Sequence, residues 1–177
     1  MKSIKKDMEL KNRVRQRLVK DWLRLSGALA SYEDRLLTTV EAVLREVDDE
    51  VFEQQVLPLA LCALGYRDID TTRRCRDGGI DAVCRDGEGR KVVAQAKRYA
   101  GAVSCEKVRA LVGVMPRLAA QGAVFVTSGR FGPQNWQEHE GLVRLIDGRT
   151  LATLLLRAGA VPGVVAEHKE IFPAEAQ

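Results

Sequence analysis

The sequence predicts an α/β sandwich around a central mixed sheet, preceded by a helical N-terminal extension. Residues 1–48 repeat apolar side chains at helical spacing. Two alternating runs follow near residues 79–85 and 91–98, and strand and helix patterns then alternate up to about residue 158. Strands that alternate with helices after a leading helix are typical of a sheet covered by helices.

The leading segment is expected to contain two helices. Residues 14–25 and residues 36–47 each carry apolar side chains three or four positions apart. Ser26, Gly27 and Ser31 lie between these runs, and we expect the helix to break there. We therefore treat residues 1–48 as a helical extension of the domain that follows.

A further helical run covers "DDEVFEQQVLPLALCALGY". It begins with acidic residues, carries Phe52, Val56 and Leu59 on one face, and ends at Gly65. Pro58 lies inside this run, where proline removes a backbone hydrogen bond and clashes with the preceding turn. We expect either a kink at Pro58 or two shorter segments that meet there.

The rest of the chain supplies the expected sheet and its remaining helices. The first two strands are joined by "DGEG", a run of turn-forming residues. "SCEKVRALVGVM" predicts a helix that begins after Ser104 and runs to Pro116. A buried strand in "AVFVTS", a short helix in the following polar loop, a strand in "LVRLID" and a helix in "GRTLATLLLRAG" complete the pattern. We expect one domain over residues 49–158 and a peripheral tail over residues 159–177.

Composition excludes several classes of protein. The 177 residues are 46% hydrophobic, and they contain no apolar run of about 18 residues, so we expect no membrane segment. The basic start lacks the apolar region of a secretory signal, which favours a cytoplasmic protein. The cysteines form no Cys-x-x-Cys pair and predict neither a zinc site nor a disulfide framework; they are Cys62, Cys75, Cys84 and Cys105.

The positive charge is concentrated in two segments. Residues 1–24 hold nine Lys and Arg against three acids, whereas the whole chain has a net charge of only +4. Residues 73–109 hold ten Lys and Arg against five acids. Basic patches suit a polyanion such as nucleic acid, although charged runs are also common on ordinary solvated surfaces.

Three polar side chains are expected to meet on one face of the two alternating strands. If paired residues have numbers that sum to 176, as 85 with 91, Asp81 lies opposite Gln95 and on the same face as Lys97. A slip of one residue would separate them. The other face, with Ile80 and Ala82 among its residues, is apolar and suited to lie under helices.

A carboxylate with neutral oxygens beside it has a known chemical use. Mg²⁺ prefers hard oxygen ligands, and it lowers the pKa of a bound water and neutralises charge on a phosphodiester. A neighbouring lysine can orient the water or stabilise the developing charge. The alternative for Asp81 is a turn residue that satisfies backbone donors, and Gln95 and Lys97 are also consistent with an exposed strand face.

The same residues resemble a known family. Asp81, thirteen residues and then Gln95-Ala96-Lys97, preceded by "GGID" and followed by "VFVTS" and "LIDGRTL", are similar to the Mrr-type restriction endonuclease catalytic domain of the PD-(D/E)XK nuclease superfamily. The similarity covers residues from about 50 to 156. It implies a restriction-endonuclease-like αβα sandwich and metal-dependent hydrolysis of DNA.

The resemblance also implies a role for each position. Asp81 would be the principal metal ligand, Gln95 and the Ala96 carbonyl neutral ligands, and Lys97 the group beside the water. In this family a helix glutamate is thought to restore the charge lost at the glutamine, and Glu53 matches that place. A glutamate on a solvated helix margin is the ordinary alternative for Glu53.

Further residues near these motifs are candidates for contact with nucleic acid. They are Arg76, Arg98, Tyr99, Thr127 and Ser128. Tyr99 is also consistent with packing at a strand end, and Thr127 and Ser128 with simply ending a strand. Tight turning before the first strand is expected from Gly78 and Gly79.

We expect a DNA endonuclease that uses Mg²⁺, with Mn²⁺ able to substitute, that forms a homodimer and that works with or without a separate specificity subunit. A nuclease-fold module that binds DNA or a partner without cutting is the alternative, and the presence of both Asp81 and Lys97 favours activity. A purely structural assembly protein is a third interpretation, and it is based on the N-terminal helices alone.

Overall fold

The computed structural model describes the chain over residues 2–71 and 79–160, with side chains described from residue 15 onward. Contacts divide the chain into two units, Met1–Leu36 and Leu37–Gln177. Beyond Ala160, the tail expected over residues 159–177 lies outside the described residues.

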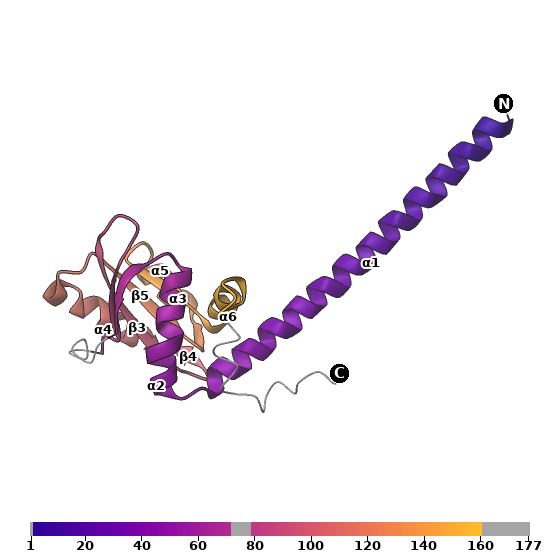
Figure 1. Ribbon diagram of the computed structural model, residues 1–177. Coiled ribbons are helices and arrows are strands. Elements are labelled where there is room, and N and C mark those ends of the chain that lie inside the picture. Colours follow the sequence, from indigo (N-terminus) through magenta and orange to yellow (C-terminus); the bar gives the residue numbers. More distant parts are fainter. Residues whose placement is uncertain (1, 72–78, 161–177) are drawn as a thin grey trace. The chain divides into compact units, whose positions relative to one another are not determined.

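Helix α1, Lys2–Glu46, is a single uninterrupted helix (Figure 1). The break expected at Ser26, Gly27 and Ser31 is therefore wrong. The Ser26 hydroxyl donates to the Leu23 carbonyl at 3.1 Å, so it is satisfied inside the helix. Gly27 has open space where a Cβ would lie. Serine and glycine only weaken a helix, whereas proline stops one, and this segment contains no proline.

The last turns of α1 belong to the core of the second unit. Val40, Val43, Leu44 and Val47 are 0 to 3% exposed and pack in one apolar cluster. The boundary expected between residues 48 and 49 therefore falls inside the second unit, because these apolar side chains are buried there.

Three short helical segments follow α1. Asp48 caps α2, Asp49–Val51, by accepting from the Glu50 N–H at 3.1 Å. The chain then widens into a π-helical turn η1, Phe52–Val56, and continues as α3, Leu57–Ala63. Pro58 lies in the first turn of α3, so the expectation that shorter segments meet there is confirmed. A wide turn suits this place, because proline has no N–H to donate and crowds the turn before it.

The central sheet has five strands in the order β1-β2-β3-β5-β7. These are β1 Arg67–Asp70, β2 Ala82–Arg85, β3 Lys91–Lys97, β5 Gly122–Thr127 and β7 Val143–Ile146. The first three are antiparallel, and β3, β5 and β7 are parallel to one another. Ala82 pairs with Ala94 and Arg85 with Lys91, which confirms the register whose residue numbers sum to 176.

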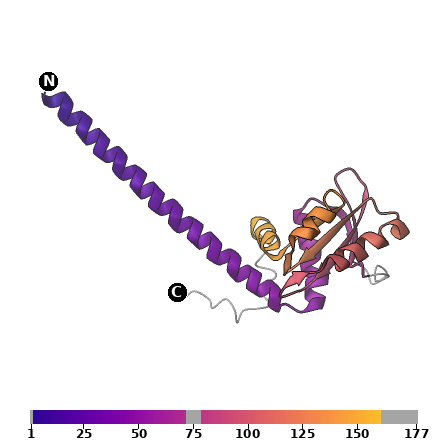
Figure 2. The ribbon, with the colours of Figure 1, turned by 180° about the vertical axis from the view of Figure 1, so that it is seen from behind.

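Helices cover both faces of this sheet. The end of α1, α3 and α6, Gly148–Arg157, pack with one apolar cluster, and α4, Cys105–Val114, packs with the other. Figure 1 shows α3 across one face, and Figure 2 shows the opposite side with α4 in front. The remaining short elements are η3 Pro116–Leu118, α5 Pro133–Glu138, and the strands β4 Ala102–Val103 and β6 Arg130–Phe131, which pair with each other. The expected αβα sandwich around a mixed sheet is confirmed.

One detail of the expected faces is wrong. Ile80 does not share a face with Ala82, but packs with Val93 and Phe125 in the second cluster. Regular alternation starts only at Ala82, because Gly79 adopts a φ of +83° and the chain turns before the strand. The face of Val93 is itself buried, so polar chemistry is confined to the strand ends.

Strand β1 has no counterpart in the sequence-based expectations. Its residues, "RDID", are mostly polar and exposed, which suits the edge of a sheet and produces no apolar alternation. Within the described part of the chain, no helix has the length and apolar character needed to cross a membrane.

Candidate active site

Asp81 lies just before β2 and is held against β3 by two hydrogen bonds. Its N–H donates to the Ala94 carbonyl at 2.9 Å, and its carboxylate Oδ2 accepts from the Ala96 N–H at 2.8 Å. The side chain is only 10% exposed. Burial raises the pKa of Asp81 above its ordinary value, although the Ala96 N–H and the Lys97 charge oppose this shift. The carboxylate is therefore fixed in a partly dry site.

Lys97 ends β3 and places its ammonium between two carboxylates. Its Nζ lies 2.6 Å from Glu53 Oε1 and 3.7 Å from Asp81 Oδ2. Burial alone would lower the pKa of Lys97, but the hydrogen bond to Glu53 and the charges of both acids outweigh burial and raise it. Lys97 is thus a fully charged, half-buried cation.

Glu53 reaches this site from the π-helical turn η1. The turn is closed by the Leu57 N–H, which donates to the Phe52 carbonyl five residues back. Phe52 and Val56 are fully buried under the turn, while Glu53 between them is directed at Lys97. Pro58 therefore leaves Glu53 oriented toward the site.

Gln95 on β3 lies against the turn at Gly79. A Cβ at Gly79 would lie 2.8 Å from the Gln95 Nε2, so a side chain there would push the end of Gln95 aside. Gly79 also needs its φ of +83°, which side chains other than glycine rarely adopt. The expected turn at Gly79 is confirmed, whereas Gly78 lies outside the described residues.

The donor set suits a hard divalent cation. Asp81 and Glu53 offer carboxylates, Gln95 an amide and Ala96 a backbone carbonyl, which are the oxygen ligands that Mg²⁺ accepts. No group of three or more His, Cys, Asp or Glu side chains is arranged for a metal within residues 2–71 and 79–160.

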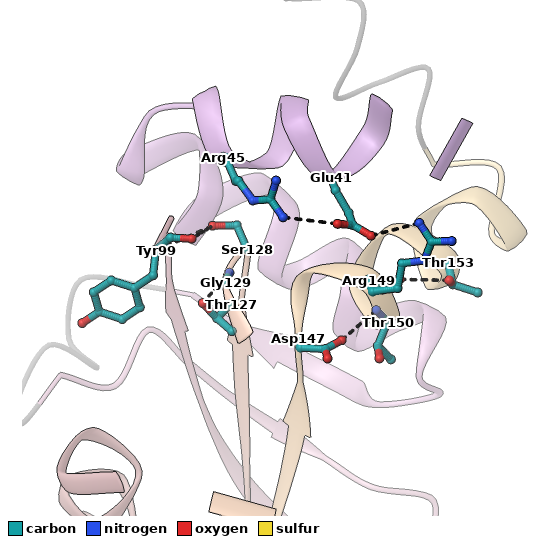
Figure 3. Close-up of polar contacts among 10 residues, drawn as sticks. All are labelled: Glu41, Arg45, Tyr99, Thr127, Ser128, Gly129, Asp147, Arg149, Thr150 and Thr153. Atoms are coloured by element: carbon teal, nitrogen blue, oxygen red, sulfur yellow. Dashed lines mark hydrogen bonds and ion pairs between the residues drawn. The ribbon is translucent and has the colours of Figure 1, made fainter. Parts of the chain in front are cut away.

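The residues expected to contact nucleic acid fall in different environments. Thr127 and Ser128 are fully buried, and each hydroxyl bonds to backbone: Gly129 N–H donates to Thr127 Oγ1, and Ser128 Oγ bonds both the N–H and the carbonyl of Tyr99, all at 3.0 Å. In this conformation neither hydroxyl is accessible to a phosphate. Figure 3 shows these contacts at the ends of the parallel strands. Arg76 lies outside the described residues.

Arg98 holds the helical segments that precede Glu53. Its Nε donates to Asp49 Oδ1 at 2.8 Å, and another guanidinium nitrogen donates to the Arg45 carbonyl at 2.7 Å. Arg98 therefore clamps the end of α1 and the start of α2 to the end of β3. Sequence patterns gave no signal for Asp49 or Arg45 here, because both lie more than 45 residues before Arg98.

Two glycines allow the strand ends to meet, and reasoning from sequence alone missed them. A Cβ on Gly148 would lie 2.3 Å from the Ser128 carbonyl oxygen, and one on Gly129 would lie 2.2 Å from the Gly101 carbonyl oxygen. Asp147 then caps α6 by accepting from the Thr150 N–H at 2.9 Å (Figure 3). The motifs "VFVTS" and "LIDGRTL" thus meet through backbone contact beside the site.

The chain matches a protein-family model. A model described as restriction endonuclease, the Mrr catalytic domain, matches residues 44–155. The chain is also 34% identical over 142 residues to the type IV methyl-directed restriction enzyme EcoKMrr of Escherichia coli strain K12. That alignment covers 75% of this chain and 46% of the relative, so the chain spans about half the length of the curated relative.

Two solved structures have folds similar to that of this chain. The DNA modification-dependent restriction endonuclease AspBHI gives a TM-score of 0.55 at 23% identity, covering 77% of this chain and 40% of that one. The MspJI restriction endonuclease, solved in complex with a 27-mer oligonucleotide, gives a TM-score of 0.50 at 25% identity. It covers 71% of this chain and 31% of that one. The shared portion is a minority of each neighbour.

Proposed function

Because the chain belongs to the restriction endonuclease family of the Mrr catalytic domain, we propose that it is a metal-dependent DNA endonuclease. The expected family is confirmed by the match over residues 44–155. The observation that carries the proposal is the contact of Lys97 Nζ with both Glu53 and Asp81, at 2.6 and 3.7 Å. This contact joins residues from three separate segments, η1, the residue before β2 and the end of β3.

Each residue has a role in this proposal. Asp81, Glu53, Gln95 and the Ala96 carbonyl would hold Mg²⁺, with Mn²⁺ able to substitute. Bound there, the cation supplies a water of lowered pKa and neutralises charge on the phosphodiester. Lys97 orients the attacking water and stabilises charge on the phosphate oxygens. Gly79 keeps the approach to Gln95 open.

DNA contact is assigned to the exposed groups around the site. Arg98 is 37% exposed, so part of its guanidinium faces solvent even while it clamps Asp49. Tyr99 is half-buried beside the same strand end. We assign these two residues to the DNA backbone, together with Arg76.

The proposal extends to the assembly. We propose residues 49–158 as the nuclease domain, with its core completed by the last turns of α1. We also propose a homodimer as the active species, because two cuts in duplex DNA need two sites. Target selection is assigned to a separate specificity subunit. We place the protein in the cytoplasm, where it would meet its DNA substrate.

The test is cleavage of supercoiled plasmid, in methylated and unmethylated forms, by the parent and by Lys97→Ala. We expect nicking or linearisation that requires Mg²⁺ or Mn²⁺, stops in EDTA and is lost in Lys97→Ala. Arg109→Ala is a matched control, since Arg109 on α4 also pairs with a carboxylate, Glu138, at 2.8 Å, but this pair lies outside the proposed site. Equal cutting by the parent and Lys97→Ala would overturn the proposal.

The outcome also decides the alternative function. If neither protein cuts under any condition while both retard DNA in a gel, the chain is a nuclease-fold binding module. The burial of Asp81 argues against that outcome. Its side chain is only 10% exposed, and burying a carboxylate costs free energy that binding alone does not require.

A further inference from the structure

The first unit of the chain exposes a continuous row of large apolar side chains. Between residues 15 and 36, seven large apolar residues on α1 are 51 to 70% exposed, and five of them lie in one row. Isolated exposed apolar residues are common on protein surfaces, but a row of this length is not. The row consists of Leu18, Trp22, Leu25, Leu29 and Tyr32, and half-buried Leu36 continues it.

The spacing of these residues is that of a coiled coil. Successive members of the row are separated by four, three, four, three and four positions, which is an unbroken heptad alternation of a and d sites. Two further exposed apolar residues, Val19 at an e site and Leu23 at a b site, lie outside this alternation. The row spans about 27 Å of helix at about 1.5 Å a residue. We call these six residues the α1 seam.

We propose that the α1 seam pairs two copies of this chain as an antiparallel coiled coil. In one antiparallel register every seam residue faces another: Leu18 meets Leu36, Trp22 meets Tyr32, and Leu25 meets Leu29 of the second copy. Each layer joins an a site to a d site, and the two-fold axis passes near Gly27. Such an interface is isologous and closes after two chains.

Charges beside the seam favour the same occupant and the same direction. Asp21 and Arg35 are both exposed and occupy g sites. In antiparallel pairing g sites flank g sites, so Asp21 of each copy lies beside Arg35 of the other, and this happens twice. In a parallel pair Asp21 would instead face the uncharged Ser26. A helix of an unrelated protein would need to supply both complementary charges by coincidence.

The inference does not depend on the nuclease proposal. It uses only residues 18–36, whereas the proposed active site uses residues 53 to 97. It specifies the surface of the homodimer and the direction of its helices. A cleavage assay can therefore fail while this inference stands, and the reverse is also possible.

Two exposed leucines on the same helix provide the first test. Leu25 is 70% exposed on the seam, and Leu23 is 57% exposed at a b site away from it. Sedimentation equilibrium of the full chain should show a dimer for the parent and for Leu23→Glu. Leu25→Glu should dissociate about a hundredfold more readily, since two buried leucines are lost per dimer. Far-ultraviolet circular dichroism should show that both variants keep their helix.

Charge exchange tests the direction of pairing. Asp21→Arg alone and Arg35→Asp alone each place like charges together twice, and each should weaken dimerisation by about tenfold. Combining both changes in one chain should restore the dimer, and mixing the two single variants should give a heterodimer. A monomeric parent, equal effects of Leu23→Glu and Leu25→Glu, or no rescue by the double exchange would overturn the proposal.

Discussion

Lys97 and Arg98 are neighbours in sequence, and both pair with an acid from the segment after α1, yet their surroundings differ. Lys97 is 33% exposed and sits between Glu53 and Asp81, the latter only 10% exposed. Arg98 is 37% exposed, but its partner Asp49 is 72% exposed. Only the Lys97 group combines burial with two converging carboxylates. Arg98 instead holds the backbone at the end of α1, because it also donates to the Arg45 carbonyl. Of these two adjacent cations, Lys97 is thus placed for chemistry and Arg98 for holding the helical segments in position.

The largest effect is expected from Lys97→Ala. Removing a positioned cation from a low-dielectric site should reduce the cleavage rate constant by about a hundredfold to a thousandfold. DNA affinity should change little, because one cation among many contributes modestly to the salt dependence of binding. Single-turnover cleavage and fluorescence anisotropy measure the two quantities separately. An equal loss of affinity and rate would remove the distinction between Lys97 and Arg98.

Glu53→Gln should have an intermediate effect. The amide keeps the size of the side chain but removes the negative charge that faces the Lys97 ammonium and the proposed cation. We therefore expect cleavage to fall by about tenfold to a hundredfold. The expected signature is a higher Mg²⁺ concentration at half-maximal rate, measured by metal titration. Asp49→Asn is the matched control, since Asp49 lies on the same segment but pairs with Arg98. A change in metal requirement in Asp49→Asn would contradict the division of roles.

Arg98→Ala should have a smaller effect that arises from position. The clamp on Asp49 and the Arg45 carbonyl would be lost, and Glu53 would be held less firmly against Lys97. Small misplacements of reacting groups are costly, so we expect kcat to fall by about tenfold with the metal requirement unchanged. Arg98→Lys should recover only part of kcat, because lysine cannot bridge both partners. Full activity in Arg98→Ala would show that the clamp does no positioning.

The smallest effect, no change at all, is expected at Cys84 and serves as a check on the fold. Cys84 is 1% exposed, and burial, assisted by the charge of Asp86, raises its thiol pKa to about 11. Iodoacetamide near pH 8 should alkylate the exposed Cys62 but spare Cys84 in the parent and in every variant above. Peptide mass spectrometry reads both sites. Labelling of Cys84 in the Lys97 or Arg98 variant would mean that lost activity reflects unfolding.

The sequence was sufficient for the hairpin that carries the site. Its alternation and "DGEG" turn predicted the register that brings Asp81 beside the Gln95 and Lys97 strand, and that register is confirmed over residues 82–85. Alternation failed at Ile80, because the backbone there follows a glycine turn and does not yet belong to the strand. Strand β1 was missed because an edge strand of polar residues produces no period.

Helical periodicity predicted helices but not their partners. Leu25 and Leu44 both lie on α1 and continue the same apolar pattern, yet Leu25 is 70% exposed and Leu44 is fully buried. Nothing in the spacing alone distinguishes an apolar face that meets a core from one that meets another chain. The Arg98 clamp was likewise invisible, since ion pairs between residues about 50 positions apart leave no local pattern.

The π-helical turn at Phe52–Val56 has a consequence for how this segment tolerates changes in length. Each residue of a helix turns the chain by about 100°, so deleting or inserting one residue between Glu53 and Pro58 would swing Glu53 about a quarter of a turn or more away from Lys97. The sheet and Asp81 would stay in place. Over this short stretch the number of residues is therefore as constrained as their identity.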